Sequence, residues 1–196
     1  MIERLLDFST SELCDGAAFA KPMDYHIKPW VGEGRIAGRA VTVDVPLGEG
    51  DLVADAILQL KEGDVLVISG KGCCDYSYWG NFRSFCAKRT GAAAVVIDGA
   101  FRDVAECRKI GFPIFARGAT CPTAAKKGTG TINTAVNCGG VCVHPGDFII
   151  GDENGVCVLK PEEAEAAMEK ARQKREREEA VIREMEETGV LKTRLK

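Results

Sequence analysis

The sequence predicts a single α/β domain, because strand-like apolar runs alternate with helix-like segments along its 196 residues. Residues 36–45 alternate in polarity and are rich in β-branched side chains, whereas residues 65–68 and 92–97 are continuously apolar, as in strands buried on both faces. Helix-like segments begin at Asp51 and at Trp79, each after one of these runs. Repeated β-α steps of this kind are typical of the α/β class.

Composition and charge exclude several classes of protein. No apolar run approaches the roughly 20 residues that a membrane-spanning helix requires, and residues 1–8 lack the apolar core of a signal peptide. The net charge is -3, and the basic residues are dispersed among glutamates, so the clustered positive face that nucleic acid needs is missing. We therefore expect a cytoplasmic protein with no membrane association and no direct nucleic-acid ligand.

Nine cysteines stand at positions 14, 73, 74, 86, 107, 121, 138, 142 and 157. Their odd number and mostly apolar surroundings favour reduced structural thiols over a disulfide framework. None has the paired C-x2-C spacing of a zinc site, so a metal or redox role is the less favoured alternative. His26 and His144 are isolated in the sequence, which favours partly buried or surface histidines over a catalytic base.

Capping and glycine signals place the elements of the N-terminal half. Ser9 and Thr10 precede a short segment that reaches Ala17, which predicts a capped helix where the fold begins. The helix that starts at Asp51 extends through Leu60. Residues 69–75, which follow the second strand and contain two glycines, predict a loop.

Arg102 and Asp103 stand at a predicted strand-to-helix junction. The strand at residues 92–97 precedes them, and a short helix at residues 104–110, closed by Gly111, follows. Such junctions bind ligands in α/β proteins, because the N–H groups at a helix start are unpaired and favour anions.

The C-terminal half combines short strands with one long charged helix. A strand at residues 113–116 is followed by a predicted surface loop at residues 118–130. Four short β runs come next, around Ala135 and at residues 141–143, 148–150 and 156–159, and Asn154-Gly155 predicts a hairpin between the last two. Pro161 then opens a long charged helix that has Gly189 near its end. This helix either lies in solvent or packs on a neighbouring subunit.

Two motifs carry possible chemistry. The turn Ser69-Gly-Lys-Gly72 matches neither nucleotide-binding glycine pattern, so a tight turn that lets a substrate approach the backbone is favoured over a phosphate site. Arg102-Asp103 pairs a guanidinium that can clamp a carboxylate with a carboxylate that can bind a hard divalent cation. A helix cap with a surface ion pair is the alternative reading of this dipeptide.

The surrounding sequence resembles the RraA-like family over roughly residues 5–185. The resemblance rests on Trp79-Gly80-Asn81, Lys88-Arg-Thr-Gly91, Val95-Val-Ile-Asp-Gly-Ala-Phe-Arg-Asp103, Gly111-Phe-Pro-Ile-Phe-Ala116, Gly139-Gly-Val141, Pro145-Gly-Asp147 and Gly151-Asp-Glu-Asn-Gly-Val156. It implies a swivelling β/β/α domain, a central sheet or small barrel wrapped by helices, with a long C-terminal helix. The expected catalytic domain spans residues 1–160, and residues 161–196 form the charged helix and tail, part of the same domain or a contact in a homotrimer or hexamer.

The same resemblance implies two functions. The family includes metal-dependent aldolases for 4-hydroxy-4-methyl-2-oxoglutarate and 4-carboxy-4-hydroxy-2-oxoadipate, which also decarboxylate oxaloacetate. It also includes RraA regulators that bind a ribonuclease. We expect a lyase that releases pyruvate from a carboxylated 2-keto acid, with a non-catalytic regulator as the alternative.

Roles for individual residues follow from the resemblance. Asp103 would bind Mg²⁺ or Mn²⁺, largely through waters, and Arg102 would hold the keto-acid end of the substrate. Gly80, Phe82 and Arg83 would contribute to substrate binding, the last two through backbone N–H groups.

The sequence departs from the family pattern at Asn81, where the aldolases usually carry an acid. That acid is thought to help remove a proton from the substrate hydroxyl, which an amide cannot do, so the resemblance predicts that decarboxylation survives better than aldol cleavage. Further hypotheses give Asp75 a carboxylate role and Arg83 the substrate's second acidic group. A neighbouring subunit would contribute one of three glutamates, Glu176, Glu178 or Glu179.

Overall fold

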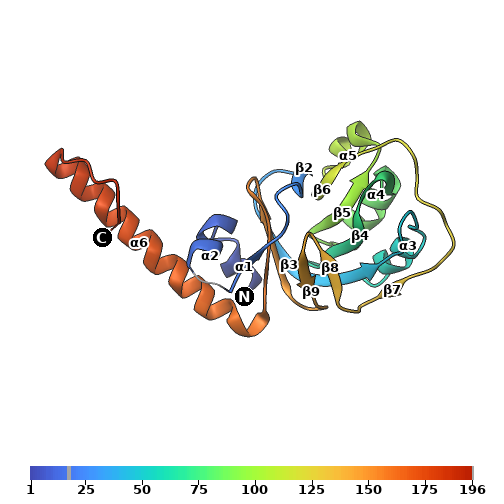
Figure 1. Cartoon of the computed structure of the whole chain (residues 1–196), viewed down its shortest axis with the longest axis horizontal. Coiled ribbons are helices and arrows are strands. Elements are labelled where there is room, and N and C mark those ends of the chain that lie inside the picture. Colours follow the sequence, from blue (N-terminus) through green and yellow to red (C-terminus); the bar gives the residue numbers. More distant parts are fainter. Residues whose placement is uncertain (17–18, 196) are drawn as a thin grey trace.

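A mixed β-sheet organises the chain, whose computed structural model describes residues 1–16 and 19–195 (Figure 1). Among these residues the main sheet has nine strands, with the order β1-β11-β10-β3-β4-β5-β6-β2 and β7 paired to β3. Its strands are β1 (Lys21–Pro22), β2 (Lys28–Val31), β3 (Ile36–Asp44), β4 (Val65–Trp79), β5 (Ala94–Phe101), β6 (Ile114–Ala119), β7 (Thr131–Ile132), β10 (Phe148–Asp152) and β11 (Gly155–Leu159). The separate hairpin consists of β8 (Val136–Cys138) and β9 (Val141–Val143).

The middle of the main sheet is parallel and buried. Strands β3, β4, β5 and β6 run parallel to one another, and all eight residues of β5 are buried. This arrangement explains why the sequence runs of β4 and β5 begin without a polar alternation. The outer pairs, β10 with β3, β11 with β10, and β2 with β6, are antiparallel. The α/β fold class and the hairpin at Asn154-Gly155 are thereby confirmed.

Helices cover the sheet in two groups (Figure 1). On one side lie α3 (Leu52–Ile57), α4 (Asn81–Arg89) and α5 (Val104–Ile110), which pack over a core that includes Val53, Leu66 and Phe101. At the other end, α1 (Ile2–Leu5), α2 (Thr10–Gly16) and the first turns of α6 (Ala164–Thr188) enclose a second core with β10 and β11. A third core lies between the sheet and the β8–β9 hairpin.

The helix α6 follows a single 3₁₀ turn, Pro161–Glu163, and extends well beyond the rest of the molecule (Figure 1). Its buried residues, Ala164, Ala167, Met168 and Ala171, all lie in its first third, so the remainder has only polar or partly exposed contacts within the chain. Gly189 ends the helix in the left-handed conformation, as the sequence suggests. Among the described residues, no helix is long and apolar enough to cross a membrane.

Several sequence predictions are wrong in detail. The helix expected from Asp51 through Leu60 ends at Ile57. The predicted loop at residues 69–75 is part of β4, because this segment pairs with the end of β5 through a series of register shifts. The helix expected from Trp79 begins at Asn81, since Trp79 still pairs with Phe101 in the sheet.

The fold also begins earlier than Ser9, because Leu5 of α1 is fully buried. Ala17, the predicted end of the first helix, lies outside the described residues. All nine cysteines are free thiols, in agreement with the expectation of reduced cysteines.

Candidate functional site

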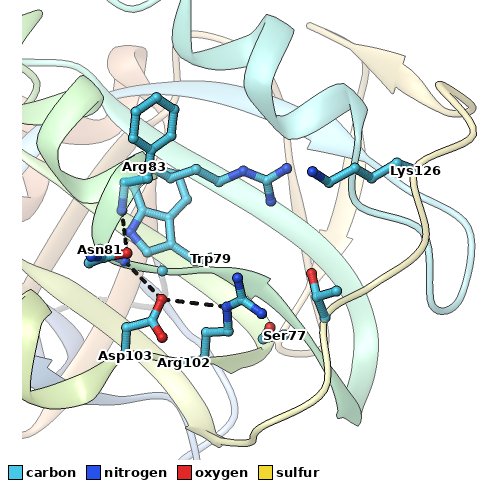
Figure 2. A pocket seen from close by; sticks show the side chains of 10 residues that line it. Ser77, Trp79, Asn81, Arg83, Arg102, Asp103 and Lys126 are labelled. Atoms are coloured by element: carbon cyan, nitrogen blue, oxygen red, sulfur yellow. Dashed lines mark hydrogen bonds and ion pairs between the residues drawn. The ribbon is translucent and has the colours of Figure 1, made fainter.

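A pocket of about 250 Å³ lies at the junctions between β4 and α4 and between β5 and α5 (Figure 2). It is lined by Ser77, Trp79, Gly80, Asn81, Phe82, Arg83, Arg102, Asp103, Thr123 and Lys126. The six site residues predicted from the sequence all line this one cavity: Gly80, Asn81, Phe82, Arg83, Arg102 and Asp103. The pocket brings together three cationic side chains, Arg83, Arg102 and Lys126, and one carboxylate, Asp103.

Asp103 is held in an unusual backbone conformation. It precedes α5 with φ 58° and ψ 43°, the left-handed region, which Asp tolerates better than most residues. Its Oδ2 atom lies 3.4 Å from the backbone nitrogen of Asn81 and 3.4 Å from Nε of Arg102. The carboxylate is about one-third exposed, at 34%, so it can accept a further partner from the pocket.

Gly80 makes room for this carboxylate. A Cβ atom at position 80 would stand 2.6 Å from Oδ2 of Asp103, closer than real Cβ contacts. Gly80 is also the residue before α4, in an extended conformation that any residue can adopt. The requirement for glycine here is therefore one of space beside Asp103 rather than of backbone freedom.

Arg102 directly follows the last residue of β5 and lines the pocket. Its backbone N–H donates to the carbonyl of Trp79 at 3.0 Å, which fixes the residue against the end of β4. Its side chain is 44% exposed, and apart from the long contact with Asp103 no ion pair occupies it among the described residues. The guanidinium turns away from Asp103 toward Ser77 (Figure 2), so it is free to form a bidentate pair with a carboxylate.

The start of α4 lies beside Asp103, because the backbone nitrogen of Asn81 is 3.4 Å from Oδ2 of Asp103. The Oδ1 atom of Asn81 accepts the backbone N–H of Phe82 at 2.8 Å, so this N–H group already has a partner within the chain. The expectation that Phe82 offers its N–H to a substrate therefore requires the Asn81 side chain to turn away. The Phe82 ring is 75% exposed.

Arg83 lines the pocket and also holds neighbouring backbone segments together. Its guanidinium donates to the carbonyl of Tyr78 and, at 2.6 Å, to the carbonyl of Gly50, and burial lowers its pKa. These bonds join α4 to β4 and to the turn before α3. The remaining N–H groups face Lys126 (Figure 2).

Lys126 is the residue that the sequence reasoning missed. It belongs to the segment predicted only as a surface loop, and no local pattern distinguishes it from Lys127 beside it. Pairing of Thr123 with Ser77, at the far end of β4, brings the segment over the pocket. With the segment in this place, the side chain of Lys126 lies in the pocket and points toward Arg83 (Figure 2).

The donor set fits a hard divalent cation held mainly by water. Among the described residues, no cluster of three or more His, Cys, Asp or Glu side chains suited to a metal occurs. Mg²⁺ commonly keeps several waters and uses one or two carboxylates. Asp103, one-third exposed beside a polar cavity, offers one such carboxylate.

The more distant candidates do not line this pocket in the chain itself. Asp75 is exposed on β4 outside it. Glu178 and Glu179 lie on α6, where Glu178 pairs with Lys174 and Glu179 with Arg183. Their proposed action across a subunit contact stays a prediction.

The fold and pocket define an α/β protein with a cavity in which three cationic side chains surround one carboxylate. The sequence model of the RraA-like family (Aldolase/RraA) matches residues 10–158. The chain therefore belongs to the RraA-like family.

Relatives in this family carry two kinds of name. A protein of Halalkalibacterium halodurans, named "Putative 4-hydroxy-4-methyl-2-oxoglutarate aldolase", is 40% identical over 79% of this chain and 73% of its own length. The 4-hydroxy-4-methyl-2-oxoglutarate aldolase of Thermus thermophilus is 30% identical over 79% and 93%. The solved structure described as the RNA-processing inhibitor RraA, also from Thermus, has a TM-score of 0.73 and 31% identity, over 79% of this chain and 94% of that one.

Proposed function

We propose that this chain is a divalent-metal-dependent carbon–carbon lyase that releases pyruvate from a carboxylated 2-keto acid. The observation that carries the proposal is the meeting of Arg102 and Asp103 in one pocket with two further cations. Three positive side chains around a small cavity suit a substrate with more than one carboxylate. The aldolase names of relatives in the same family support a lyase.

Each side chain has a role that its geometry supports. The guanidinium of Arg102 binds the carboxylate at the keto-acid end, and Asp103 is the residue that would hold Mg²⁺ or Mn²⁺. When bound, the cation would supply positive charge that stabilises the negative charge developing on the keto oxygen as the carbon–carbon bond breaks. Arg83 and Lys126 lie across the pocket, where they attract the rest of the anionic substrate.

Asn81 should affect the two candidate reactions, decarboxylation and aldol cleavage, to different extents. Decarboxylation of oxaloacetate breaks a bond to a carboxylate and needs no proton removed from a hydroxyl. Aldol cleavage requires a base for that proton, and the Asn81 amide, whose oxygen caps the Phe82 N–H, cannot accept one. We therefore infer that oxaloacetate decarboxylation is the stronger activity and that aldol cleavage is weak.

The assembly belongs to the same proposal. As in the family, we infer a homotrimer or a hexamer, with the long α6 helix as a contact between subunits. A subunit contact would also be the route by which a glutamate of α6 reaches a neighbouring pocket.

Pyruvate release tests this function. The assay couples lactate dehydrogenase to oxaloacetate or 4-hydroxy-4-methyl-2-oxoglutarate, with Mg²⁺ or Mn²⁺ and after chelation. Asp103→Asn is the sharpest variant, because Asn tolerates the left-handed backbone of position 103 while removing the charge. We expect it to lose at least about 100-fold of the metal-dependent rate.

Asp55→Asn, which removes an exposed carboxylate of α3 outside the pocket, serves as the matched control and should keep the wild-type rate. A wild-type protein that binds metal but releases no pyruvate from either substrate would exclude both reactions.

A second candidate is a non-catalytic regulator of a ribonuclease. It is favoured by the structure named RNA-processing inhibitor RraA and by the loss of the acid at position 81. Adding the purified chain to a ribonuclease E cleavage assay tests it, since a regulator lowers the cleavage rate in proportion to complex formation whether or not Asp103 is intact.

A further inference from the structure

The turn from Gly48 to Asp51 connects both cations on the far side of the pocket. The backbone N–H of Ala125 donates to the carbonyl of Gly48 at 2.7 Å, and the N–H of Gly50 donates to the carbonyl of Ala125 at 3.0 Å. The carbonyl of Gly50 in turn accepts the guanidinium of Arg83. One turn thus fixes the position of Arg83 and that of the segment that carries Lys126.

Glu49, at the centre of this turn, is a buried carboxylate whose charge attracts the nearby Arg83 guanidinium without forming an ion pair with it. Its residue is 3% exposed, and no ion pair to it exists among the described residues. One oxygen accepts the N–H of Asp51 at 2.8 Å, and the other accepts the N–H of Lys127 at 2.8 Å. Burial disfavours its charge, but these N–H groups outweigh burial, and the pKa of Glu49 lies below its ordinary value.

The hydrogen bond from the Lys127 N–H to Glu49 also constrains the backbone next to Lys126. Lys126 is exposed, lines the pocket, and makes no hydrogen bond or ion pair of its own among the described residues. Nothing on the Lys126 side chain therefore fixes where its ammonium lies. The position of that charge depends on the backbone, which Glu49 holds from one side and the turn at Gly48 from the other.

We propose that Glu49 is a positioning residue, whose buried carboxylate holds residues 125–128 so that Lys126 reaches into the pocket and binds the substrate's second carboxylate. This inference rests on the proposed function only in taking the pocket as the place where a 2-keto acid binds. It adds a specificity role for Lys126 and a reason for a buried charge that contacts no ligand. Arg83, with two backbone carbonyls already bound, contributes less to that second carboxylate.

Binding of two stable keto acids tests the inference without turnover. We would measure, by calorimetry with Mg²⁺ present, the affinities of 2-oxoglutarate, which has two carboxylates, and of 2-oxobutyrate, which has one. Lys126→Met should weaken 2-oxoglutarate about tenfold, the effect of losing one charged hydrogen bond, and leave 2-oxobutyrate within about twofold. Glu49→Gln should weaken 2-oxoglutarate alone by about three- to tenfold, and the double variant should be no weaker than Lys126→Met.

Hydrogen exchange supplies a readout that does not depend on any ligand. In Glu49→Gln the amide of Lys127 loses a charged acceptor, and its exchange should quicken relative to the wild type. Asp147→Asn is the control for a buried carboxylate outside the pocket. Asp147 is equally buried, at 3%, and accepts the backbone N–H of His144, and it differs from Glu49 in also pairing with Lys160. The Asp147→Asn variant should lower stability without changing the ratio of the two affinities.

Several outcomes would overturn the inference. These are equal weakening of both keto acids in Glu49→Gln, full additivity with Lys126→Met, or unchanged exchange at Lys127. A wild-type chain that binds neither keto acid would remove the inference and the proposed function together. Binding of 2-oxoglutarate without release of pyruvate from any substrate would instead remove the lyase function and leave the inference intact.

Discussion

The absence of a side chain at Gly80 leaves space for the Asp103 carboxylate, and we expect activity to depend on that space. In Gly80→Ala the new Cβ would meet Oδ2 of Asp103 at 2.6 Å, so the carboxylate must move. A displacement of about 1 Å in a catalytic group can cost about 100-fold in rate. We predict a loss of that order in metal-dependent pyruvate release, with a far-UV circular dichroism spectrum like that of the wild type.

Gly118→Ala is the control for this prediction. Gly118 lies in β6, and a Cβ there would meet only the Cys74 sulfur at 4.0 Å, an ordinary contact. This variant should keep its activity. Full activity in Gly80→Ala would mean that the present position of the Asp103 carboxylate is not the one used in the reaction.

Asn81→Asp should restore the missing base. The new carboxylate would lie beside Asp103, whose Oδ2 is already 3.4 Å from the backbone nitrogen of residue 81. Since general-base assistance contributes about 10² to 10⁴ in rate, we predict a gain of at least about 100-fold in aldol cleavage of 4-hydroxy-4-methyl-2-oxoglutarate. Oxaloacetate decarboxylation should change much less.

Comparing the two rates in the coupled pyruvate assay, at saturating Mg²⁺, checks this prediction. Equal gains with both substrates would point to tighter metal binding by a second carboxylate rather than to a base. No gain with either would show that position 81 does not limit the reaction.

The residues of the pocket differ in how far the sequence alone could place them. Arg102 and Asp103 follow a buried strand and precede a helix, so their place at a junction could be predicted from periodicity and capping. Lys126 could not be placed, because its position depends on pairing between Thr123 and Ser77, which are 46 residues apart in the printed sequence. The space at Gly80 is likewise set by a side chain distant in the sequence.

At the scale of elements, hydrogen bonds between Glu12 and Arg175 join α2 to α6. Ser9 and Glu12 form a reciprocal cap at the start of α2, in which the N–H of Ser9 donates to Glu12 at 2.8 Å and the N–H of Glu12 to the Ser9 hydroxyl at 3.2 Å. Arg175 of α6 adds two bonds to the Glu12 carboxylate, at 2.7 and 3.0 Å. Bonding to Arg175, followed by that to Ser9, lowers the pKa of Glu12 to about 2.

We predict that Glu12→Gln lowers the free energy of unfolding by about 1–2 kcal/mol at pH 7, as for the loss of a helix cap with a charged hydrogen bond. The folded pKa of about 2 lies below the ordinary value of 4.5, so the carboxylate stabilises the fold fully above pH 4.5. That contribution is lost as the pH falls through about 2. The difference between wild type and variant should therefore shrink across this range.

Urea unfolding from pH 7 down to pH 2.5 measures that difference. Glu187→Gln, at an exposed position of α6 near its end, is the control and should be close to neutral at every pH. A difference that stayed constant as the pH fell would mean that Glu12 acts by packing and not by its charge.

The full length of strand β4 could not be predicted from the local sequence pattern. Its first residues are continuously apolar and were predicted correctly, whereas Gly70 and Gly72 in the following segment indicate a loop. That segment is a strand because β5 continues beside it. Gly70 stands so close to the carbonyl of Asp98 that a Cβ there would lie 2.7 Å away. A glycine required by close pairing thus has the same local signature as one required by a turn.

At the scale of the whole molecule, the order of the sheet was beyond the reach of local patterns. The class follows from alternating elements, but the placement of β10 beside β3 depends on contacts between segments more than 100 residues apart. The long helix was predicted from Pro161 and Gly189, and whether it lies in solvent or packs on a neighbour could not be decided from its charge pattern. The structure narrows that choice, because the burial of α6 within the chain stops at Ala171.

The distal part of α6 and the tail after it expose apolar side chains that a monomer leaves in water. Ile182, on a helix whose 25 residues span about 37 Å, is 50% exposed. Val190 and Leu191, in the tail after Gly189, are 59% and 81% exposed. We predict that this arm packs on a second copy, so the wild-type chain should have the mass of a trimer or hexamer in light scattering. Ile182→Glu should weaken association by about 1.5–3 kcal/mol, or roughly 10- to 100-fold. Leu58→Glu makes the same change at an apolar side chain that directly follows α3 and is 83% exposed, and it should leave the mass unchanged. A monomeric wild type would contradict the assembly and the supply of a glutamate from a neighbouring α6.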